Sequence, residues 1–598
     1  MRKLLLFIVL MLSTMSLITK AQQAEVAFSI PGGFYDSIFH IALSCSDEGH
    51  VIHYTTNGNS PTVSSKVYSD PLLLDENLYS HSDIYTIRTC PDSIWYQPDS
   101  VKHCIVIRAA AFDAKGNRVS EVATQSYFIR SLGCDSHNLP VVSICADSLD
   151  LFDYDRGIMV PGRCCDSTNQ FWTGNYHQKG RQWERPCNIE FYEADNDGIN
   201  RQVGLRMHGS SARAGQQKGL KVYARKEYGE NRFQYAFFEE LENRSFKHLV
   251  LKPFCHRGAS HAVQDRVCSQ MAVGLAVESL ASRFVVLYIN GEYWGIYDLK
   301  EKPDEHYLAD HYGCSPQSID MVESWRGKVS CGDNTGFIEM MRWFVKADLS
   351  SDEDYWKACS LIDVDSFIDY YCLEMFIGNY DWPNNNMRCW REGEGKWRWL
   401  FFDGDDCLDG SDNILSSVLA TGGKVTESNL LFSKLLMNQD FRDRFYGRFG
   451  RLMTNQFDYK TTSAYLEANI AKVRGEVESH VERFGRPASV SSFDQQMWHA
   501  NHFLKYRVLN MTTLLYWFYY YNGWKYNYSA IASQKSFKIN PKRHNPTFLL
   551  RMALQFKDWR YVEIYHDYMQ LKRHEAIKKS GAYRWWSGTW LFRKMKRS

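Results

Sequence analysis

Two loops rich in Asp and Asn contain the residue types that phosphoryl transfer requires, in the required order. The first loop reads NYDWPNNN, so that Asp381 is followed five residues later by Asn386. The run KWRWLFF at 396–402 predicts a strand that leads directly into Asp403 and Asp405. In kinase-type sites the first Asp accepts the proton of the substrate hydroxyl, while the Asn and the Asp after the strand bind magnesium.

Magnesium suits such loops because it prefers one or two carboxylates together with phosphate oxygens, and because phosphoryl transfer depends mainly on positioning and charge neutralisation. The same loops have two other interpretations. Asp and Asn also favour ordinary turns, where their side chains bond to nearby backbone groups. A calcium loop of the EF-hand type is excluded, since Cys407 and Leu408 stand where it needs a ligand and a Gly.

A second candidate element lies upstream, where residues 203–225 read VGLRMHGSSARAGQQKGLKVYAR. This pattern predicts a strand, a Gly/Ser turn and a second strand. The turn at 209–211 could present backbone N–H groups to a phosphate, although it matches neither the P-loop nor the kinase glycine-rich loop. Lys218 and Lys221 follow on the second strand, where a nucleotide-contacting lysine is expected; exposed strand lysines are the alternative. A serine hydrolase is not supported, because no G-x-S-x-G motif surrounds Ser210.

Length and charge narrow the class of protein. A chain of 598 residues exceeds a single core and predicts two or three domains. The formal net charge of +1 argues against a nucleic-acid partner. Residues 1–21 begin with basic side chains, continue with an apolar run and end with small residues, which indicates a secretory signal peptide. We therefore expect a secreted protein of the periplasm or cell surface, without a transmembrane span, since no other stretch is long and apolar enough.

The sixteen cysteines are compatible with disulfides in an exported chain. A zinc ribbon is not indicated, because the cysteines do not form C-x-x-C pairs. Bridges are expected among Cys45, Cys90 and Cys104, with no connectivity specified. Cys268 and Cys372 lie in apolar periodic segments, where buried free thiols are expected.

Short β-rich runs and turns predict a small sandwich at the N-terminus, and apolar periodicity predicts helices toward the C-terminus. The fold class is therefore α+β. Helices are predicted at 264–281, at 353–377 and from 430 to about 516. Asn290-Gly291 predicts a hairpin between strands at 284–289 and 293–299. The basic, aromatic end of the chain is either a solvated helical tail or a contact for an acidic partner or membrane surface.

Four stretches, in order, resemble the spore-coat-protein-H (CotH) kinase family of secreted atypical protein kinases. They read GLRMHGSSAR…QKGLKVYAR, VVLYINGEYWGIYDLKEKPDEHYL, GNYDWPNNNMRCWR and WRWLFFDGDD. The resemblance implies an atypical protein-kinase-like α+β domain that uses ATP with Mg²⁺ or Mn²⁺. It also implies phosphorylation of Ser or Thr on exported or surface proteins.

The resemblance implies roles for individual positions. Asp381 takes the catalytic position, and the metal-binding positions fall on Asn386, Asp403 and Asp405. The positions expected to bind the nucleotide are Lys218, Lys221, Arg206, Arg213 and Glu301. The chain departs from the family pattern at Gly219, where Ser is usual, and in the order Asp-Gly-Asp at 403–405, where the middle residue is usually apolar.

Residues 23–130 resemble the chitobiase C-terminal module through HYTTNGNSPT and VIRAAAFDAKGNRVSEVATQSYFI. This resemblance implies an immunoglobulin-like accessory domain with a spacer or binding role, dispensable for chemistry, whose ligand by analogy is a cell-surface glycan. Two alternatives to a kinase stay open: a non-catalytic surface scaffold with a degenerate kinase-like domain, and a carbohydrate hydrolase with paired carboxylates. The predicted divisions are a signal peptide at 1–21, a β-sandwich at 23–130, a linker at 131–138, a kinase-like domain at 139–516 and an extension at 517–598.

Overall fold

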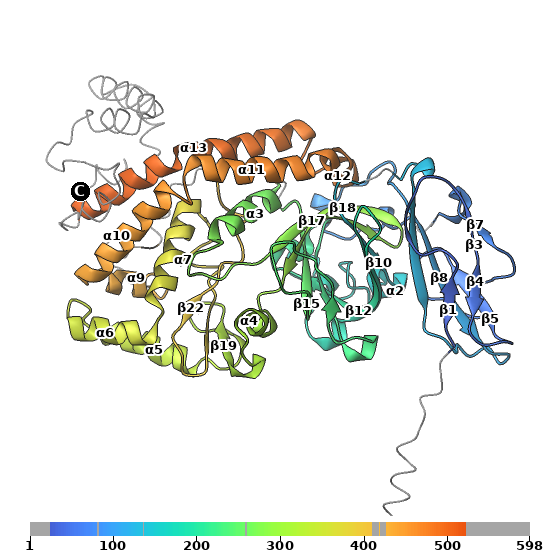
Figure 1. Cartoon of the computed structure of the whole chain (residues 1–598), viewed down its shortest axis with the longest axis horizontal. Helices are drawn as coiled ribbons and strands as arrows, with labels where there is room; N and C mark the ends of the chain where they lie inside the picture. The colour runs from blue at the N-terminus through green and yellow to red at the C-terminus, as the bar shows by residue number, and fades with distance from the viewer. Residues whose placement is uncertain are drawn as a thin grey trace, which may run out of the picture.

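The computed structural model describes residues 24–79, 83–134, 137–256, 260–409, 418 and 426–521. The predicted signal peptide and nearly all of the C-terminal extension lie outside the described residues. Figure 1 shows a β-rich N-terminal module at one end, a β-barrel in the middle and a helical part at the other end. The predicted α+β class, with a β-rich N-terminal region and a helical C-terminal part, is confirmed.

The N-terminal module is built around one mixed sheet whose apolar face is buried. Its strands are, in order across the sheet, β2 (Gly33–Tyr35), β9 (Ala123–Ile129), β8 (Ile105–Phe112), β5 (Val51–Thr55) and β6 (Lys66–Val67). Two small strand pairs face it: β1 (Val26–Phe28) with β4 (Leu43–Cys45), and β3 (His40–Ile41) with β7 (Leu72–Leu73). Ile41, Ile107 and Tyr127 are buried between these layers, as expected of a small sandwich.

A closed barrel forms the centre of the molecule. Its strands are, in order around the barrel, β10 (Val141–Cys145), β11 (Arg185–Tyr192), β12 (Gly198–His208), β13 (Gly219–Tyr223), β16 (His248–Pro253), β18 (Glu292–Glu301) and β17 (Ser282–Ile289). Residues such as Leu205, Leu220 and Leu251 fill its interior. Because side chains alternate along a strand, the intervening positions face outward, and many of these are charged.

Two predictions about the barrel strands are confirmed. Residues 203–225 form a strand, a turn and a strand, namely β12 and β13. β17 and β18 form the predicted hairpin, in which Ile289 pairs with Glu292. Asn290 and Gly291 adopt φ values of 48° and 85°, the left-handed conformation that a two-residue hairpin turn requires. Closure of the sheet into a barrel was not predicted.

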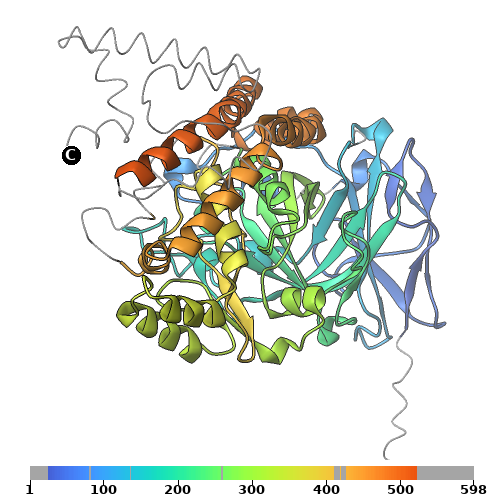
Figure 2. The ribbon, with the colours of Figure 1, turned by 60° about the vertical axis from the view of Figure 1, so that its left-hand side comes forward.

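Helices cover one end of the barrel and form the rest of the molecule, as the yellow and orange ribbons of Figure 2 show. These helices are α3 (His261–Ala272), α4 (Glu305–Tyr312), α5 (Thr335–Lys346), α6 (Asp352–Leu361), α7 (Val364–Ile377), α9 (Leu430–Leu435), α10 (Gln439–Thr454), α11 (Tyr459–Val473), α12 (Val477–Phe484) and α13 (Val490–Tyr521). The short helix α2 (Ser148–Phe152) lies instead on the side of the barrel that faces the N-terminal module (Figure 1). Shorter strands pair beside them: β14 (Phe233–Gln234) with β15 (Ser245–Phe246), and β20 (Val329–Cys331), β19 (Ile319–Val322), β21 (Cys389–Glu392) and β22 (Arg398–Trp399) in one sheet.

Two predicted helices have different boundaries in the structure. The predicted helix at 353–377 is divided into α6 and α7, because the Asp363 carboxylate accepts hydrogen bonds from the first backbone N–H groups of α7 and starts a new helix. The predicted helix at 264–281 ends at Ala272, since Gly274 follows with a φ of 80° that a helix does not accommodate.

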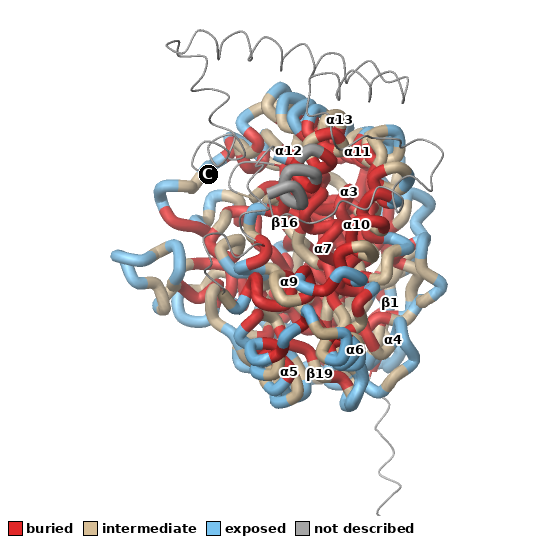
Figure 3. Tube along the Cα trace, turned by 90° about the vertical axis from the view of Figure 1, so that its left-hand side faces the viewer, coloured by how far each residue is buried: buried red, intermediate tan, exposed pale blue. Residues whose placement is uncertain are grey.

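Helix α7 is the central element of the helical part. All of its residues except Asp365 are buried, and Figure 3 shows it within the buried interior. A helix that is buried on every side belongs to a protein core. The loop that contains Asp381 follows this helix directly, so the core fixes where the loop begins.

Among the described residues, no helix is long and apolar enough to cross a membrane.

The N-terminal module packs closely against the barrel. The Glu292 carboxylate accepts hydrogen bonds from the backbone N–H groups of Ile84 and Tyr85, at 2.7 and 2.8 Å. Phe128 of the module belongs to the same hydrophobic cluster as the helical core. The expected linker at 131–138 contains His137, which is buried and lies 2.9 Å from Glu476 and 3.0 Å from the Tyr288 hydroxyl. Among the described residues of this connection, Cys134 and His137 are therefore packed into the structure, whereas Ser131 and Gly133 are exposed.

Candidate functional site

The two aspartates predicted to bind metal converge on one lysine. The Nζ atom of Lys252 lies 2.6 Å from Asp403 Oδ1 and 2.9 Å from Asp405 Oδ1. It also lies 3.0 Å from Asp265 Oδ2. Lys252 belongs to β16 of the barrel, Asp265 to α3, and the two aspartates to the loop after β22. Two neighbouring elements, β16 and α3, therefore meet a loop about 150 residues further along the chain at a single ammonium group.

The alternation of β16 explains why Lys252 points at this loop. Leu249 and Leu251 face the barrel interior, so Lys252 faces outward toward α3. On the neighbouring strand, Lys300 Nζ lies 2.6 Å from Asp265 Oδ2 and 3.8 Å from Asp298 Oδ2. A layer of paired charges thus fills the contact between barrel and helix, and it is buried on the Lys300 side.

The departure from the family pattern at Gly404 has a geometric reason. The Gly404 N–H donates a hydrogen bond of 2.9 Å to Asp265 Oδ1, which draws the backbone against α3. A Cβ atom at this position would lie 2.9 Å from the Phe401 ring, 3.2 Å from Cys268 Cβ and 3.4 Å from Asp265 Oδ1. Only a residue without a side chain allows the backbone to come this close to α3. This close contact orients Asp403 and Asp405, which flank Gly404.

The acids of this layer have different pKa values because they differ in burial and in the charges beside them. Burial and the adjacent Asp405 carboxylate raise the pKa of Asp403 well above its ordinary value. Burial also favours neutral Asp405, yet Lys252 and a hydrogen bond with Asp403 hold the pKa of Asp405 well below its ordinary value. Burial raises the pKa of Asp298 to about 6. Burial would lower the pKa of Lys252, but its three carboxylate partners outweigh burial and raise that pKa.

The donor set fits a hard divalent cation. Four acidic side chains face only two ammonium groups, those of Lys252 and Lys300, so the layer contains more acids than bases. The side chains of Asp403 and Asp405 are 30% and 21% exposed, so a ligand can reach both. Among the described residues, no group of three or more His, Cys, Asp or Glu side chains forms a complete metal site. Mg²⁺ does not require one, because it takes one or two carboxylates with waters and phosphate oxygens.

The loop that contains Asp381 is hydrogen-bonded to the aspartate loop. Gly378 ends α7 in the left-handed conformation. The buried Asn379 then donates hydrogen bonds to Glu374 Oε2, at 2.9 Å, and to the Asp403 carbonyl, at 3.1 Å. The N–H of Tyr380 donates to the Asp406 carbonyl at 2.8 Å. The two loops predicted to do chemistry therefore lie side by side and are held together through their backbones.

Aromatic packing fixes the far side of the same loop. Trp382 is buried and its ring meets that of Tyr371 edge to face, at 4.8 Å. The indole N–H of Trp325 donates a hydrogen bond of 2.7 Å to the Pro383 carbonyl. Asp381 itself is half-buried. Asn386 is also half-buried and has a φ of 54°, a left-handed conformation that Asn tolerates better than most residues. Asn379 and Tyr380 thus hold the start of this loop beside the aspartate loop; Asp381 is next in the chain, and Asn386 lies further along the same loop.

Two of the predicted nucleotide-binding residues lie near this site on the outer face of the barrel. Arg206 and Lys221 are paired across β12 and β13, and the Arg206 guanidinium lies 5.3 Å from the centre of the Tyr223 ring. Burial, followed by the nearby Lys302 and two arginines, lowers the pKa of Lys221 to about 7. Burial lowers the pKa of His208 on the same face, and Lys221 and Lys252 lower it further. A basic surface therefore continues from Lys252 along these strands.

The other three predicted nucleotide-binding residues have structural contacts. Lys218 is fully buried and donates hydrogen bonds to the carbonyls of Arg213 and Gly215, at 2.7 and 2.9 Å. Arg213 is buried and donates to the carbonyls of residues 176, 178 and 209. Glu301 is buried, accepts a hydrogen bond from the Ala281 N–H and pairs with His311 at 2.8 Å. The structure does not bring these three to the aspartate cluster; Lys218 and Arg213 instead support the Gly/Ser turn.

Sequence reasoning missed Lys252 and Asp265. The signal for Lys252 was present, since HLVLKP alternates and places Lys252 opposite the apolar leucines. Asp265 stood as an isolated acid on a helix of mixed polarity, next to no recognised motif. What the sequence could not supply was the packing of β16 against a loop that lies 151 residues further along the chain.

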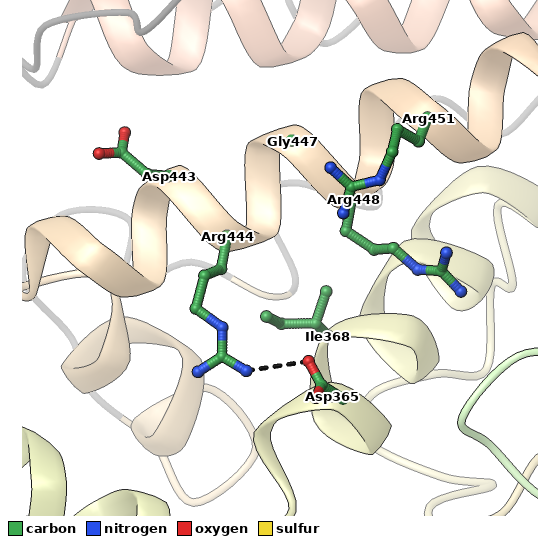
Figure 4. Close-up of a pocket in the computed structure, with 7 residues that line it drawn as sticks. All are labelled: Asp365, Ile368, Asp443, Arg444, Gly447, Arg448 and Arg451. Carbon is green, nitrogen blue, oxygen red and sulfur yellow. Dashed lines mark hydrogen bonds and ion pairs between the residues drawn. The ribbon is translucent and has the colours of Figure 1, made fainter. Parts of the chain in front are cut away.

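A separate hollow lies away from this site, between α7 and α10, with a volume of about 390 Å³ (Figure 4). The arginines that line it are largely paired with acids. Arg444 lies 2.9 Å from Asp365, and Arg448 contacts both oxygens of Asp369 at 2.6 and 2.8 Å. The hollow lacks the combination of clustered carboxylates and lysine found at Lys252, so we assign the candidate site to the latter.

A strand lysine, a helix carboxylate and aspartates that follow a second strand occur here in the order in which kinase-type sites have them. Comparison with known proteins agrees: the chain belongs to the CotH kinase protein family, whose model matches residues 205–511, just over half of the chain. A second model, of the chitobiase/beta-hexosaminidase C-terminal domain, matches residues 30–124. Both resemblances predicted from the sequence are thereby confirmed.

A curated relative shares only a short segment with the chain. This endoglucanase from Clostridium saccharobutylicum is 47% identical over 47 residues, which are 8% of this chain and 10% of the endoglucanase. The chain therefore spans about a tenth of that relative's length, and the match carries no inference about catalysis.

Proposed function

We propose that the protein is a secreted atypical protein kinase that transfers the γ-phosphoryl group of ATP to Ser or Thr of exported or surface proteins. The observation that supports this best is the contact of Lys252 with both Asp265 and the Asp403–Asp405 loop. In protein kinases, a strand lysine pairs with an acid on the following helix, and an Asp after a later strand binds the metal. The same order of elements, β16, α3 and the loop after β22, occurs here.

Each residue then has a stated task. Asp381 accepts the proton of the acceptor hydroxyl and orients its oxygen for attack. Asp403 and Asp405, with Asn386 on the adjacent loop, are the residues that would bind Mg²⁺ or Mn²⁺. A metal ion bound there would neutralise charge on the transferring phosphoryl group. Lys221 and Arg206 extend the positive surface toward the remaining phosphates of the nucleotide.

Secretion and the nature of the partner rest on other features. The N-terminal 21 residues support export, and the chitobiase-like module supports attachment to a surface glycan, which would bring the kinase domain to surface proteins. The competing function is a non-catalytic scaffold. The presence of Asp381, Asn386 and Asp403 favours activity, because a scaffold has no need of them.

The decisive experiment combines nucleotide binding with phosphate transfer. The purified chain is incubated with radiolabelled ATP, Mg²⁺ or Mn²⁺ and generic protein substrates. We expect the Asp381→Asn variant to bind metal–ATP with near-normal affinity in calorimetry yet to transfer phosphate on the order of 10²–10⁴-fold more slowly. Asp403→Ala should lose metal-dependent nucleotide binding.

The matched control is Asp409→Asn, an exposed acid of the same loop, which should bind and transfer normally. If the wild-type chain neither binds ATP nor labels any protein, the kinase assignment fails and the scaffold replaces it. If Asp403→Ala binds metal–ATP with undiminished affinity, the metal assignment alone is wrong.

A further inference from the structure

Two buried cysteines meet directly beneath the candidate site. The Sγ atoms of Cys268 and Cys407 are 3.1 Å apart, although the residues are 139 positions apart in the chain. Both side chains are almost completely buried, with residue exposures of 0% and 1%. A disulfide has an S–S bond of about 2.05 Å, so a shift of about 1 Å would bring the sulfurs to bonding distance.

The positions of the two cysteines connect them to the charged layer. Cys268 lies on α3, three residues after Asp265 and so on the same side of the helix. Cys407 lies two residues after Asp405. A Cβ atom added at Gly404 would lie 3.2 Å from Cys268 Cβ. The helix and the loop are therefore in close contact with no side chain between them.

In place of the free thiol expected at Cys268, we propose that Cys268 and Cys407 form a disulfide in the mature protein, and that this bond fastens the aspartate loop to α3. The cross-link would hold Asp403 and Asp405 against Lys252 and Asp265 independently of any bound ligand. It would also close a long segment of the chain, which includes the Asp381 loop, into one covalent ring. The inference concerns the covalent structure and does not depend on the proposed kinase activity.

The reaction is a thiol–disulfide exchange with an external disulfide, such as a dithiol oxidant of the export compartment or oxidised glutathione. The thiolate of one cysteine attacks the external disulfide, which forms a mixed disulfide and releases one thiol. The second cysteine, after losing its proton, attacks the mixed disulfide, forms the Sγ–Sγ bond and releases the second thiol. Two electrons and two protons thereby pass from the cysteine pair to the oxidant.

Burial determines when this exchange occurs. Burial raises the pKa of both thiols, so the folded, reduced pair is poorly reactive. The bond therefore forms during folding, before α3 closes over the loop. Once formed, it is shielded from reductants in the same way.

Peptide mapping tests the proposal. The full chain, produced in an oxidising export compartment, is treated with a thiol-blocking reagent and digested with trypsin without reduction. Tryptic peptides 267–283 and 399–424 each contain one cysteine, Cys268 and Cys407 respectively. We expect one linked species, lighter than the sum of the two peptides by two hydrogen atoms, which separates on reduction. Recovery of both peptides as blocked, unlinked species would overturn the proposal.

A second measurement tests whether the bond supports the fold. The Cys268→Ser and Cys407→Ser variants should each abolish the linked species and lower the unfolding midpoint, on the order of 5 °C. Reduction should lower the unfolding midpoint of the wild type but should not change that of either variant. The matched control is Cys372→Ser, a buried cysteine of α7, which should retain the linked species. To reduce the shielded bond, the wild type is unfolded in reductant and refolded before its midpoint is measured. Linked peptides without any effect of this reduction on the midpoint would refute the fastening role.

Discussion

Glu190 offers a quantitative test of how the N-terminal module is joined to the barrel. It lies on β11 and is fully buried against β9 of the module. Its Oε1 accepts hydrogen bonds from the Ser126 N–H at 3.0 Å and from the Tyr192 hydroxyl at 2.7 Å. Its Oε2 lies against the Ser126 hydroxyl, which in turn contacts Ser143 at 2.8 Å. The side chain of Asn200 is a further neutral neighbour, at 3.2 Å.

Burial raises the pKa of Glu190 from 4.5 to about 7, although hydrogen bonds from Ser126 and Tyr192 oppose the shift. The folded protein therefore holds a proton that the unfolded chain has already released between pH 4.5 and about 7. Over this window stability falls as pH rises, and above it the loss is complete. A shift of this size corresponds to about 3 kcal/mol of unfolding free energy.

The test substitution is Glu190→Gln, whose amide keeps the shape and can donate to the Ser126 hydroxyl as a protonated Glu does. At pH 5 the variant and wild type should unfold with similar free energies. At pH 8 the variant should be more stable by up to about 3 kcal/mol, because it has no charge to bury. Urea unfolding followed by intrinsic fluorescence at several pH values gives both quantities.

Other buried acids also contribute to the pH dependence of the wild type, such as Glu374, whose pKa burial raises to about 8. The difference between wild type and variant removes these shared contributions. Glu240→Gln, at an exposed position, serves as the control and should follow the wild-type curve. Parallel pH curves for wild type and Glu190→Gln would refute the reasoning, because they would mean that Glu190 is ionised in both states or that the interface opens without cost.

Three further predictions follow from the site. Lys252→Met should abolish metal-dependent ATP binding measured by calorimetry, whereas Lys218→Met should leave binding intact and lower thermal stability; the reverse pattern would restore Lys218 as the nucleotide lysine. Gly404→Ala should destabilise the chain by roughly 1–3 kcal/mol and weaken metal–ATP binding, since the added Cβ would press on the Phe401 ring. Unchanged binding and stability would contradict the close packing of the Gly404 backbone against α3. Deletion of 24–130 should reduce solubility and unfold the barrel in circular dichroism, because the module shares the core; a folded, active truncation would instead show that the module is dispensable.

The elements that sequence patterns predicted well are those fixed by local chemistry. The Asn290-Gly291 turn requires left-handed backbone and specifies its hairpin. Asp403 and Asp405 directly follow an extended segment, as predicted, although its regular part, β22, is short. Gly378 and the polar loop after α7 were likewise visible in the sequence. In each case the residues that determine the structure are within a few positions of one another.

What the sequence did not predict depends on contacts between distant segments. Closure of the barrel requires β10 to pair with β17, which begins more than a hundred residues later. Lys218 was predicted to contact the nucleotide, and its buried position was not foreseen. The alternation of a strand does not reveal which of its two faces is turned toward a site. Lys218 precedes the regular part of β13 and turns under the Gly/Ser turn, where the Tyr176 ring lies 4.1 Å from its Nζ. Lys218 and Lys252 both lie in segments whose sequence predicts a strand, and only their packing in the folded protein distinguishes them.

The difference between these lysines also shows what Lys252 contributes. Lys218 is bound by neutral carbonyls, and burial lowers its pKa to about 7, so it needs no charge for its structural role. Lys252 is bound by three carboxylates that would repel one another without it. Removing a charge from such a cluster leaves the others uncompensated, so Lys252 must hold the aspartates in place before any ligand arrives. Lys252 therefore positions the acids that we propose bind the metal, and it is also the residue that we propose a phosphate would meet, which would couple the fold of the site to its proposed chemistry.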